Sequence, residues 1–476
     1  MRRMPEFDLV IRGGCVATAS DETVCDIGVR DGRVVALGEA LGAARDELNA
    51  AGCIVTPGGV DAHCHLDQPM SDGSRMADDF ETGSLSAAFG GTTTVIPFAQ
   101  QIRGQPLRTA VEDYHARANG KSIIDYAFHL ILTDPTENVL GQELPALIRE
   151  GYTSFKIYMT YDDMKLNDRQ ILEVLSLARR EGALTMIHAE NADCIAWLAD
   201  RLEMRGDIAP KFHAASRPPV VEREATHRAV SLAELVQAPV LIVHVSGGEA
   251  IDQISAAQAR GLQVFAETCP QYLFLTADDL DLDGFEGAKC ICSPPPRDEK
   301  DHAAVWLGLA RGVFQVFSSD HAPFRYDDTE GKMVHGKNAA FRHVPNGIPG
   351  LETRMPLLFS EGVGKRRISL QRFVALTAAN PARLYGLYPR KGSIAVGADA
   401  DIVVWDPERR VTITNDILHH AVDYTPYEGM MVTGWPVATV ARGQIICSDG
   451  ECTARRGRGE FLKCSAPDTV FFMPRP

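Results

Sequence analysis

The sequence lacks any run of basic residues and any long apolar segment. Its 63 acidic side chains outnumber its 48 basic ones, which gives a formal net charge of −15 at pH 7. An acidic chain without clustered lysine and arginine is not expected to bind nucleic acid or an anionic membrane. No apolar stretch approaches the roughly 20 residues of a transmembrane helix, and no signal-peptide core follows Met1-Arg2-Arg3. We therefore expect a cytoplasmic protein with neither nucleic acid nor a membrane as a partner.

A paired cysteine pattern is also missing. The chain has 11 cysteines, an odd number, and their spacings show no repeated pair. Free thiols in a reducing cytosol are the simplest interpretation. Cys64 lies between two histidines, but side chains alternate along a strand. We therefore expect Cys64 to point to the opposite face and to pack there, not to bind a metal.

No internal repeat or low-complexity segment is present, and the order of apolar runs indicates the organisation instead. Residues 1 to about 57 contain short β-like segments, among them a hairpin with Asp31-Gly32 as its turn. From residue 58 to about 322, apolar β-like runs alternate with stretches of helical spacing such as Asp168–Glu181, Glu222–Val236 and Glu249–Arg260.

There are eight of these runs, and several are apolar on both faces, as expected for a parallel sheet covered on each side. The runs are Gly59–Leu66, Thr92–Phe98, Ile123–Leu132, Ser154–Met159, Leu184–His188, Val240–Val245, Gln263–Thr268 and Gln315–Ser319. Eight strands alternating with helices predict an α/β fold, a TIM-like (β/α)8 barrel. A doubly wound open sheet is the alternative.

The β pattern returns after three helical stretches that end near Tyr385. It runs through Asp401–Trp405, Val411–Ile413 and Val437–Ile446. Both ends of the chain therefore lack the helical alternation of the middle. We predict a small β-sandwich domain built from residues 1–57 and 388–476, with the barrel inserted between them over residues 58–387.

The first barrel run carries two histidines at a spacing that suits a metal. His63 and His65 are two residues apart in a predicted strand, so both imidazoles project from the same face. Two imidazoles on one face can share a borderline metal such as zinc. The structural alternative, two histidines lining a barrel, leaves two polar rings to be satisfied in a core.

Other candidate ligands end the later runs, where a barrel places its reactive groups. They are Lys156 in the fourth run, His188 at the end of the fifth, His244 at the end of the sixth and Asp320 after the eighth. A lysine inside a barrel is costly to bury as a cation, and pairing with Asp320 is the structural explanation. Histidine and carboxylate side chains on several strands around one rim predict a metal site.

The remaining histidines are expected to have supporting or structural roles. We expect His129 to lie in the core or behind the ligands, and His321 to point away from Asp320. His335, His343, His419 and His420 are expected to be solvated or structural.

At this point the sequence resembles a known family, the cyclic amidohydrolases of the dihydropyrimidinase and hydantoinase type, over almost its whole length. The resemblance lies in the segments 57–66 (PGGVDAHCHL), 90–94 (GGTTT), 154–156 (SFK), 188–191 (HAEN), 216–219 (SRPP), 267–273 (ETCPQYL), 293–295 (SPP), 318–321 (SSDH), 346–350 (NGIPG) and 397–401 (GADAD).

The resemblance implies two zinc ions per subunit. By position, His63, His65 and Asp320 would hold one ion, and His188 and His244 the other. Lys156 would carry a carbamate formed from carbon dioxide, which would bridge the ions together with a hydroxide. Such a pair lowers the pKa of a bridging water and polarises a carbonyl group.

The resemblance further implies hydrolysis of a hydantoin or dihydropyrimidine ring to an N-carbamoyl amino acid. Asp320 would move the proton, first as a base and then as an acid, and Tyr161 would bind the carbonyl oxygen or oxyanion. Ser293 and Asn346 would contact the ring imide through main-chain groups. Residues matching the apolar lining of the substituent pocket in hydantoinases are Leu66 and Tyr158.

Two other functions fit similar motifs. An allantoinase would use similar ligands with a more polar substrate, and some relatives of dihydropyrimidinase have lost ligands and act as interaction proteins. All six ligand positions are filled here, which disfavours an interaction protein that has lost its metal ligands. Dihydroorotases carry an arginine two residues after the second histidine, where this chain has Asp67, an acid that favours an uncharged ring.

The resemblance also implies an oligomer. Relatives are commonly homotetramers, and the segment after about residue 451 could reach a neighbouring subunit. The expected partners are thus a small cyclic amide and further copies of the same chain.

Overall fold

The fold of residues 5–473 is described by a computed structural model, and its centre is a parallel β-barrel. The sheet order is β14-β13-β12-β11-β10-β9-β7-β6, with β8 paired to β7. The barrel strands are β6 (Gly59–Cys64), β7 (Thr92–Gln100), β8 (Asp125–Tyr126), β9 (His129–Ile131), β10 (Ser154–Tyr158), β11 (Leu184–His188), β12 (Val240–Ile242), β13 (Val264–Thr268) and β14 (Val316–Phe317). All eight predicted runs are confirmed as strands, although the third is divided between β8 and β9.

The first and last strands meet, so the sheet is nearly closed. A parallel bridge pairs Cys64 with His321. Two hydrogen bonds accompany it: Asp320 N–H donates to the His63 carbonyl at 2.9 Å, and His65 N–H donates to the His321 carbonyl at 2.7 Å. The predicted barrel is therefore confirmed, and its closure brings the two ends of the barrel sequence into contact.

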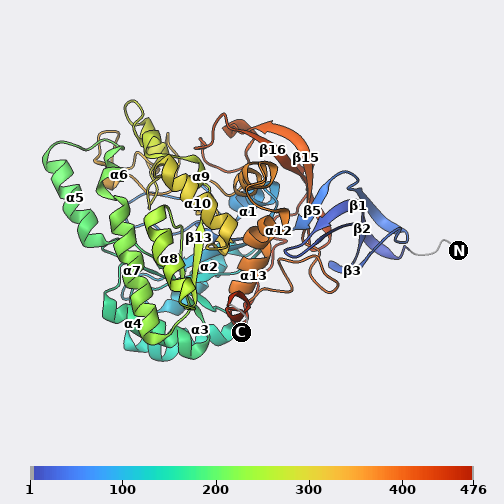
Figure 1. Cartoon of the computed structure of the whole chain (residues 1–476), viewed down its shortest axis with the longest axis horizontal. Helices are drawn as coiled ribbons and strands as arrows, with labels where there is room; N and C mark the ends of the chain where they lie inside the picture. The colour runs from blue at the N-terminus through green and yellow to red at the C-terminus, as the bar shows by residue number, and fades with distance from the viewer. Residues whose placement is uncertain (1–4, 474–476) are drawn as a thin grey trace.

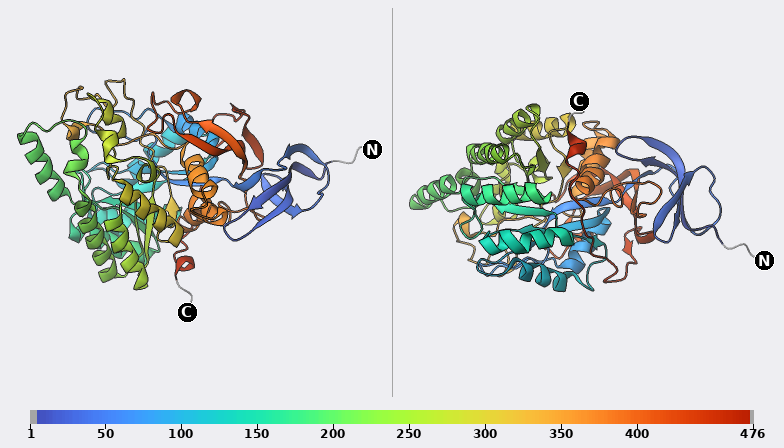
Figure 2. Two further views of the ribbon diagram at one scale, coloured as in Figure 1. Left: turned by 45° about the horizontal axis from the view of Figure 1, so that its top comes forward. Right: turned by 90° about the horizontal axis from the view of Figure 1, so that it is seen from below.

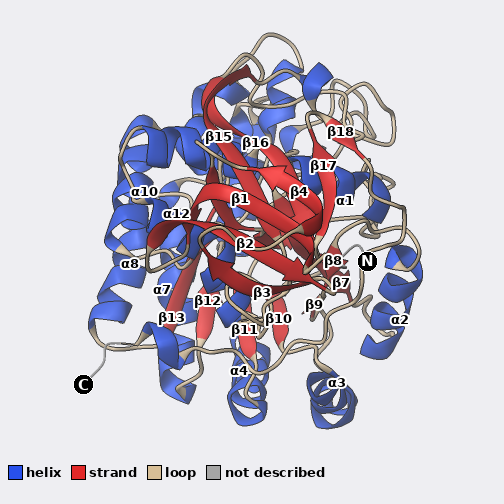
Figure 3. Ribbon diagram, turned by 90° about the vertical axis from the view of Figure 1, so that its right-hand side faces the viewer, coloured by secondary structure: helices blue, strands red, loops and turns tan. Residues whose placement is uncertain are grey.

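Helices cover the outside of the barrel (Figures 1 and 3). They are α1 (Phe80–Phe89), α2 (Leu107–Ala118), α3 (Leu144–Glu150), α4 (Asp168–Glu181), α5 (Ala192–Met204), α6 (Phe212–Ser216), α7 (Pro219–Val236), α8 (Gly248–Ala259), α9 (Gln271–Phe274) and α10 (Glu299–Arg311). Three more follow the last strand: α11 (Arg354–Leu358), α12 (Leu370–Val374) and α13 (Asn380–Leu384).

Helix α4 shows how local sequence sets these boundaries. Asn167 caps its first turn, accepting from Gln170 N–H, while the Gln170 side chain bonds back to the cap backbone. Gly182 ends the helix at φ 71°, a left-handed conformation that glycine adopts without strain. Side chains at helical spacing, including Ile171, Val174 and Ala178, are buried against the barrel. The predicted span is confirmed at both ends.

Strands from both termini form a second sheet beside the barrel (Figure 3). Its order is β18-β17-β16-β15-β5-β1-β2-β3, with β4 paired to β1. The strands are β1 (Phe7–Ala17), β2 (Glu22–Arg30), β3 (Arg33–Gly38), β4 (Ala44–Asn49), β5 (Ile54–Pro57), β15 (Ile402–Thr412), β16 (Met431–Ala441), β17 (Gln444–Ser448) and β18 (Glu451–Cys452).

This sheet folds over its own core, as expected for a sandwich. Ile27 of β2 and Val34 of β3 share one buried cluster with Ile402 of β15 and Val440 of β16. Strand β5 joins the two halves, because it pairs with both β1 and β15. The contribution of both termini is confirmed, and the limits 1–57 and 388–476 stay a prediction.

The described part of the C-terminal segment packs on the chain's own barrel. Leu462 N–H donates to the Tyr126 carbonyl at 2.7 Å, and Cys464 N–H donates to the Gly151 carbonyl at 3.0 Å. In Figure 2 this segment ends close to the barrel helices, far from the N-terminal strands. The predicted reach of the segment after about residue 451 toward a neighbouring subunit stays a prediction.

Two further predictions concern the cysteines and membrane-spanning helices. All 11 cysteines are free, and Cys64 is fully buried, in agreement with its predicted packing role. Within residues 5–473, no helix combines the length and the apolar character that crossing a membrane requires.

A buried ionic cluster joins the barrel to the terminal sheet. Lys391 Nζ lies 2.7 Å from Asp125 of β8, 2.7 Å from Asp401 and 3.1 Å from Asp399, just before β15. Burial disfavours the ammonium, but the three carboxylates outweigh this and raise the pKa of Lys391. Burial likewise disfavours the Asp125 carboxylate, yet Lys391 holds the pKa of Asp125 below its ordinary value.

Replacing this lysine should destabilise the protein strongly. Lys391→Met leaves three buried carboxylates without their cation, which should lower the free energy of unfolding by about 3–5 kcal/mol at pH 7. Because the Asp125 pKa is depressed, the stabilisation is present above about pH 4 and is lost as the pH falls through the folded-state pKa. Urea unfolding at pH 7 and at about pH 3 measures both effects. The exposed Lys365→Met is the control, and equal stabilities of the two variants at pH 7 would contradict the assignment.

Candidate active site

A cavity of about 370 Å³ opens at the carboxyl ends of the barrel strands. This size suits a small ligand. The predicted site residues that line it are His65, Lys156, Tyr158, Tyr161, His188, His244, Ser293, Asp320 and Asn346. His63 lies directly behind them, in contact with Asp320 and Lys156. The structure thus brings together residues from seven separate parts of the chain.

Three of these residues form a cluster that could hold a metal ion. The side chains of His63, His65 and Asp320 offer ligand atoms that lie within 4.8 Å of one another. Asp320 Oδ1 is 3.1 Å from His63 Nε2 and 3.4 Å from His65 Nε2. All three side chains are buried or nearly so, and two imidazoles with one carboxylate are ligands that zinc accepts.

Two partners behind the cluster fix the orientation of the imidazoles. Glu267, in β13, lies 2.6 Å from His63 Nδ1, and Gln68 Oε1 lies 2.5 Å from His65 Nδ1. A carboxylate or an amide oxygen can only accept, so each Nδ1 carries a proton and each Nε2 faces the cluster. Neither partner was predicted from the sequence. The position of Glu267 near the end of a barrel strand could have indicated its role.

Lys156 is buried without a carboxylate partner. Its Nζ lies 2.7 Å from His63 Nε2 and 4.6 Å from the centre of the Phe98 ring. Within residues 5–473 it makes no ion pair, so the structural explanation, a salt bridge with Asp320, is not borne out. Burial lowers the pKa of Lys156 to about 8, which enlarges the fraction of neutral, nucleophilic amine.

His188 and His244 form a second group at the same cavity. Their ring centres are 4.4 Å apart. His188 Nε2 lies 2.8 Å from Glu190, whose carboxylate also accepts from Arg217 at 2.6 Å, so His188 Nδ1 is left for another partner. His244 Nδ1 is buried and has no hydrogen-bond partner within residues 5–473. A buried nitrogen of this kind calls for a ligand.

Three of the ten non-glycine residues with a positive φ in residues 5–473 lie at the same cavity. Tyr161, His244 and Asp320 have positive φ angles of 68°, 38° and 48°. A non-glycine residue costs free energy in this left-handed region and stays there only when its surroundings require it. Three such residues at one cavity indicate that the position of their side chains is functional.

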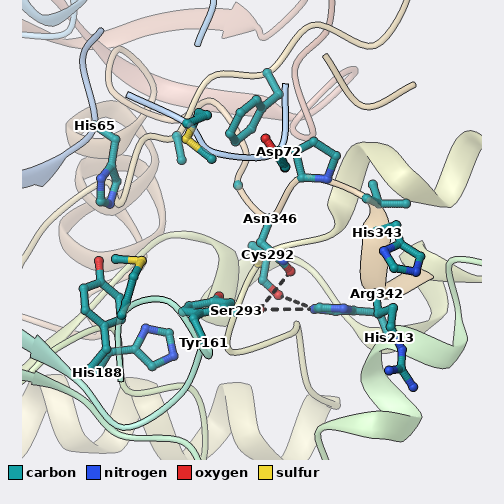
Figure 4. A pocket seen from close by; sticks show the side chains of 18 of the residues that line it. His65, Asp72, Tyr161, His188, His213, Cys292, Ser293, Arg342, His343 and Asn346 are labelled. Atoms are coloured by element: carbon teal, nitrogen blue, oxygen red, sulfur yellow. Dashed lines mark hydrogen bonds between the residues drawn. The ribbon is translucent and has the colours of Figure 1, made fainter. Parts of the chain in front are cut away.

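Tyr161, Ser293 and Asn346 lie on the wall facing the histidines, as Figure 4 shows. The Ser293 hydroxyl donates to Asn346 Oδ1 at 2.9 Å. Burial raises the pKa of Tyr161 to about 12, although the Arg217 guanidinium opposes this, so the phenol stays protonated at neutral pH. Within residues 5–473, no hydrogen bond uses the main-chain N–H or carbonyl of Asn346 or the carbonyl of Ser293.

Of the two residues expected in the substituent pocket, Tyr158 lines the cavity and Leu66 does not. Tyr158 reaches the cavity, but its ring stacks on His188 with centres 5.3 Å apart, at the metal-ligand end. Leu66 is fully buried in the core, where its methyl groups lie against Gly83 of α1, and it is not part of the cavity lining. Its role in binding a substituent stays a prediction.

The outer half of the cavity contains residues that the sequence did not indicate as a site. His335 and His343, expected to be solvated or structural, both line it, with ring centres 5.8 Å apart. Arg342 and His213 also line it (Figure 4). His335 lies on a loop, His213 in the short helix α6, and Arg342 and His343 in a single 3-10 turn, so no strand periodicity could have indicated where they point.

Other histidines behave as expected. His129 is buried, with its nitrogens 2.6 Å from Ser154 Oγ and 2.9 Å from the Ala62 carbonyl. His321 points away from Asp320, and its Nε2 lies 3.1 Å from Asp78. Asp67 does not line the cavity and pairs with Arg117 at 3.1 Å, so it would not repel an acidic ring directly. An arginine is nevertheless absent from that position.

Comparison with known proteins identifies relatives over nearly the whole chain. The model of the amidohydrolase family matches residues 54–446. The D-hydantoinase of Ralstonia pickettii is 44% identical over 458 residues, which cover 96% of this chain and 99% of that protein.

Solved structures agree with this comparison. A D-hydantoinase structure superposes with a TM-score of 0.94 at 44% identity and covers 97% of this chain and 99% of its own. The dihydropyrimidinase of Brevibacillus agri also gives a TM-score of 0.94, at 40% identity, covering 98% and 99% of the two chains.

The second-layer glutamate provides a direct test of the metal cluster. Glu267→Gln keeps the volume but removes the negative charge beside His63, which should lower zinc affinity about 10- to 100-fold. Competition with a chromophoric chelator measures the affinity, and Glu408→Gln, on an exposed part of β15, is the matched control. Unchanged affinity in Glu267→Gln would show that this carboxylate does not support a bound ion.

Proposed function

This chain belongs to the amidohydrolase family, and we propose that it opens the ring of a hydantoin or a related cyclic amide to give an N-carbamoyl amino acid. It is a hydrolase of cyclic amides. The similarity to D-hydantoinases at 44% identity over nearly the full length supports hydantoin as the ring. The observation that carries the proposal is the buried His63–His65–Asp320 cluster facing free main-chain donors and acceptors across a small cavity.

The residues present fit a pair of divalent metal ions. We propose that His63, His65 and Asp320 hold one ion and that His188 and His244 hold the other. Two features support this. The ligand atoms of His63, His65 and Asp320 lie within 4.8 Å of one another, and the buried Nδ1 of His244 has no hydrogen-bond partner within residues 5–473. Two imidazoles alone are too few for a stable zinc site, so the second ion requires at least one further ligand.

Lys156 is the residue we propose for that further ligand. Its neutral amine would add to carbon dioxide, forming an N–C bond and releasing one proton, to give a carbamate with two oxygens. The modification replaces a buried cation that has no carboxylate partner by an anion placed between the two histidine groups. Two observations support this position: Lys156 Nζ lies 2.7 Å from His63 Nε2, and the ring centres of His63 and His244 are 5.4 Å apart.

The bound metal pair would supply Lewis-acid polarisation of the ring carbonyl and a water of lowered pKa. The protein supplies the proton transfer: Asp320 accepts a proton from the attacking water and passes it to the departing ring nitrogen. Burial alone would raise the pKa of Asp320, but the neighbouring His63 and His65 hold it well below its usual range, so its carboxylate is ionised and ready to accept.

The opposite wall would bind and orient the ring. A cyclic imide offers carbonyl acceptors and an N–H donor, which match the free N–H of Asn346 and the free carbonyl of Ser293. The protonated Tyr161 hydroxyl would donate to the carbonyl oxygen under attack and stabilise the negative charge that develops there.

The ring substituent would extend into the outer cavity. Apolar side chains there support an aryl or alkyl group; they are Met70, Met76, Met164, Ile195, Ala199, Phe324, Phe341 and Val344. Allantoinase is the second candidate, because His335, Arg342 and His343 at the same end could hydrogen-bond a ureido group.

We also propose that the protein is cytoplasmic and forms a homo-oligomer, by resemblance a tetramer. Helix α5 supports association, because it projects from the barrel (Figure 1) with Trp197 54% exposed and Met204 83% exposed. Apolar side chains that large are common at interfaces between subunits. Sedimentation analysis of the purified protein gives the number of subunits.

Substrate comparison tests the proposed reaction. On zinc-loaded protein, we expect kcat/KM for a 5-aryl hydantoin to exceed that for dihydrouracil and for allantoin. Lys156→Ala should reduce it by more than about a hundredfold, since it removes the bridging ligand. The exposed Lys365→Ala is the control. Undiminished activity in Lys156→Ala would refute the bridged site, and turnover of allantoin alone would favour the second candidate.

Removing one hydroxyl tests the role of Tyr161. Tyr161→Phe should lower kcat about 10²- to 10³-fold, the usual cost of losing a donor to a developing oxyanion. Because the Tyr161 pKa is about 12, its hydroxyl is protonated throughout pH 6–9, so this factor should not change with pH in that range. Tyr388→Phe, away from the cavity, is the control. If the loss in kcat disappeared toward pH 9, this would contradict the role of a protonated Tyr161 hydroxyl as the hydrogen-bond donor.

A further inference from the structure

Lys332 is a fully buried lysine outside the metal cluster, on the loop between β14 and α11. Its Nζ donates to three main-chain carbonyls: Ile291 at 3.0 Å, Pro345 at 2.7 Å and Gly347 at 2.7 Å. Lys332 is 1% exposed. In the described part of the chain, no carboxylate lies within 4.0 Å of its Nζ. An ammonium has three donors and no acceptor, so the three carbonyls match its hydrogen-bonding capacity.

The carbonyls that Lys332 binds belong to the wall that faces the metal cluster. Ser293, Pro345, Asn346 and Gly347 all line the cavity, whereas Lys332 is not part of the lining and lies behind it. Figure 4 shows Asn346 and Ser293 side by side at the centre of this wall. Lys332 therefore holds two segments, 291–293 and 345–347, from the side away from the ligand.

Because the peptide group is planar, these hydrogen bonds also set the directions of the main-chain N–H and carbonyl of Asn346. In a trans peptide the carbonyl and the N–H point in opposite directions. Holding the Pro345 carbonyl on Lys332 therefore turns the Asn346 N–H away from Lys332. Gly347 N–H donates to the Ile291 carbonyl at 3.0 Å, which in the same way turns the Asn346 carbonyl away from that side. Both peptide planes around Asn346 are fixed.

We propose that Lys332 is a positioning residue for ring binding, which holds the free main-chain groups of Asn346 and Ser293 in place for the cyclic imide. This assignment rests on the proposed function. Lys332 touches neither the ring nor a metal ligand, and it acts through the backbone. Gly347 makes the arrangement specific, because its φ of +147° and the closeness of Ala322 leave no room for a side chain.

A methionine at this position would fill the space but would bind no carbonyl. The Ile291 carbonyl would keep the Gly347 N–H, whereas within residues 5–473 the Pro345 and Gly347 carbonyls have no other donor. Two buried acceptors would then be unsatisfied, and the peptides around Asn346 would be free to rotate. Ground-state binding of the ring should suffer more than the chemical step.

The test compares Lys332→Met and Lys332→Gln with wild type and with Lys337→Met, an exposed lysine on the same loop. For a hydantoin that the wild type hydrolyses, we expect KM to rise about tenfold or more in Lys332→Met while kcat falls less, with an intermediate KM in Lys332→Gln. Zinc content should equal that of the wild type. Amide hydrogen exchange should become faster in residues 287–294 and 342–349 and stay unchanged around His63.

Three outcomes would overturn the assignment. A wild-type KM in Lys332→Met would do so, even if amide hydrogen exchange became faster, because the hydrogen bonds of Lys332 would then not contribute to binding of the ring. Parallel loss of zinc and kcat would mark Lys332 as a residue of general folding. If the wild type hydrolyses no cyclic amide at all, the proposed function fails and the assignment fails with it, whereas an active wild type with an unaffected variant removes this inference alone.

Discussion

Closure of the barrel between its first and last strands is the constraint on which the site depends. His63 and His65 end the first strand, and Asp320 follows the last, so 254 or more residues separate them in sequence. Two main-chain hydrogen bonds, from Asp320 to His63 and from His65 to His321, join these segments directly. The backbone contact sets the distances between the three ligand side chains. The metal cluster is therefore a property of the closed sheet, and a sheet that stayed open would not form it.

Buried charge behind the cavity serves to orient the ligands. Glu267 fixes the tautomer of His63, and Glu190, itself bound by Arg217, fixes that of His188. Inside a protein such partners act strongly because solvent does not screen them. Each carboxylate would be costly if it were alone, and each has a histidine or an arginine as a partner. The ligands are thus held in place by a second layer of side chains as well as by the barrel strands.

Three buried lysines in one chain illustrate how the same cation is accommodated in different ways. Lys391 is surrounded by three carboxylates and joins the barrel to the terminal sheet. Lys332 binds three carbonyls and holds the cavity wall. Lys156 has neither, since its amine lies against His63 and aromatic rings. Among the three, only Lys156 lacks an acceptor set suited to an ammonium, and this difference supports the carbamate that we propose for it.

The sequence by itself determined the barrel strands, helix α4 to its last residue, and the metal-ligand candidates. Local patterns carry that information: apolar runs, capping residues and the two-residue spacing of His63 and His65 act over a few positions. Tertiary structure alone decided the rest. Leu66 packs in the core, and His335 and His343 reach the cavity from the segment between β14 and α11. Glu267 and Lys332 acquired their partners from segments far away in the chain. Contacts of this kind depend on how the elements pack, and no periodicity in the sequence encodes them.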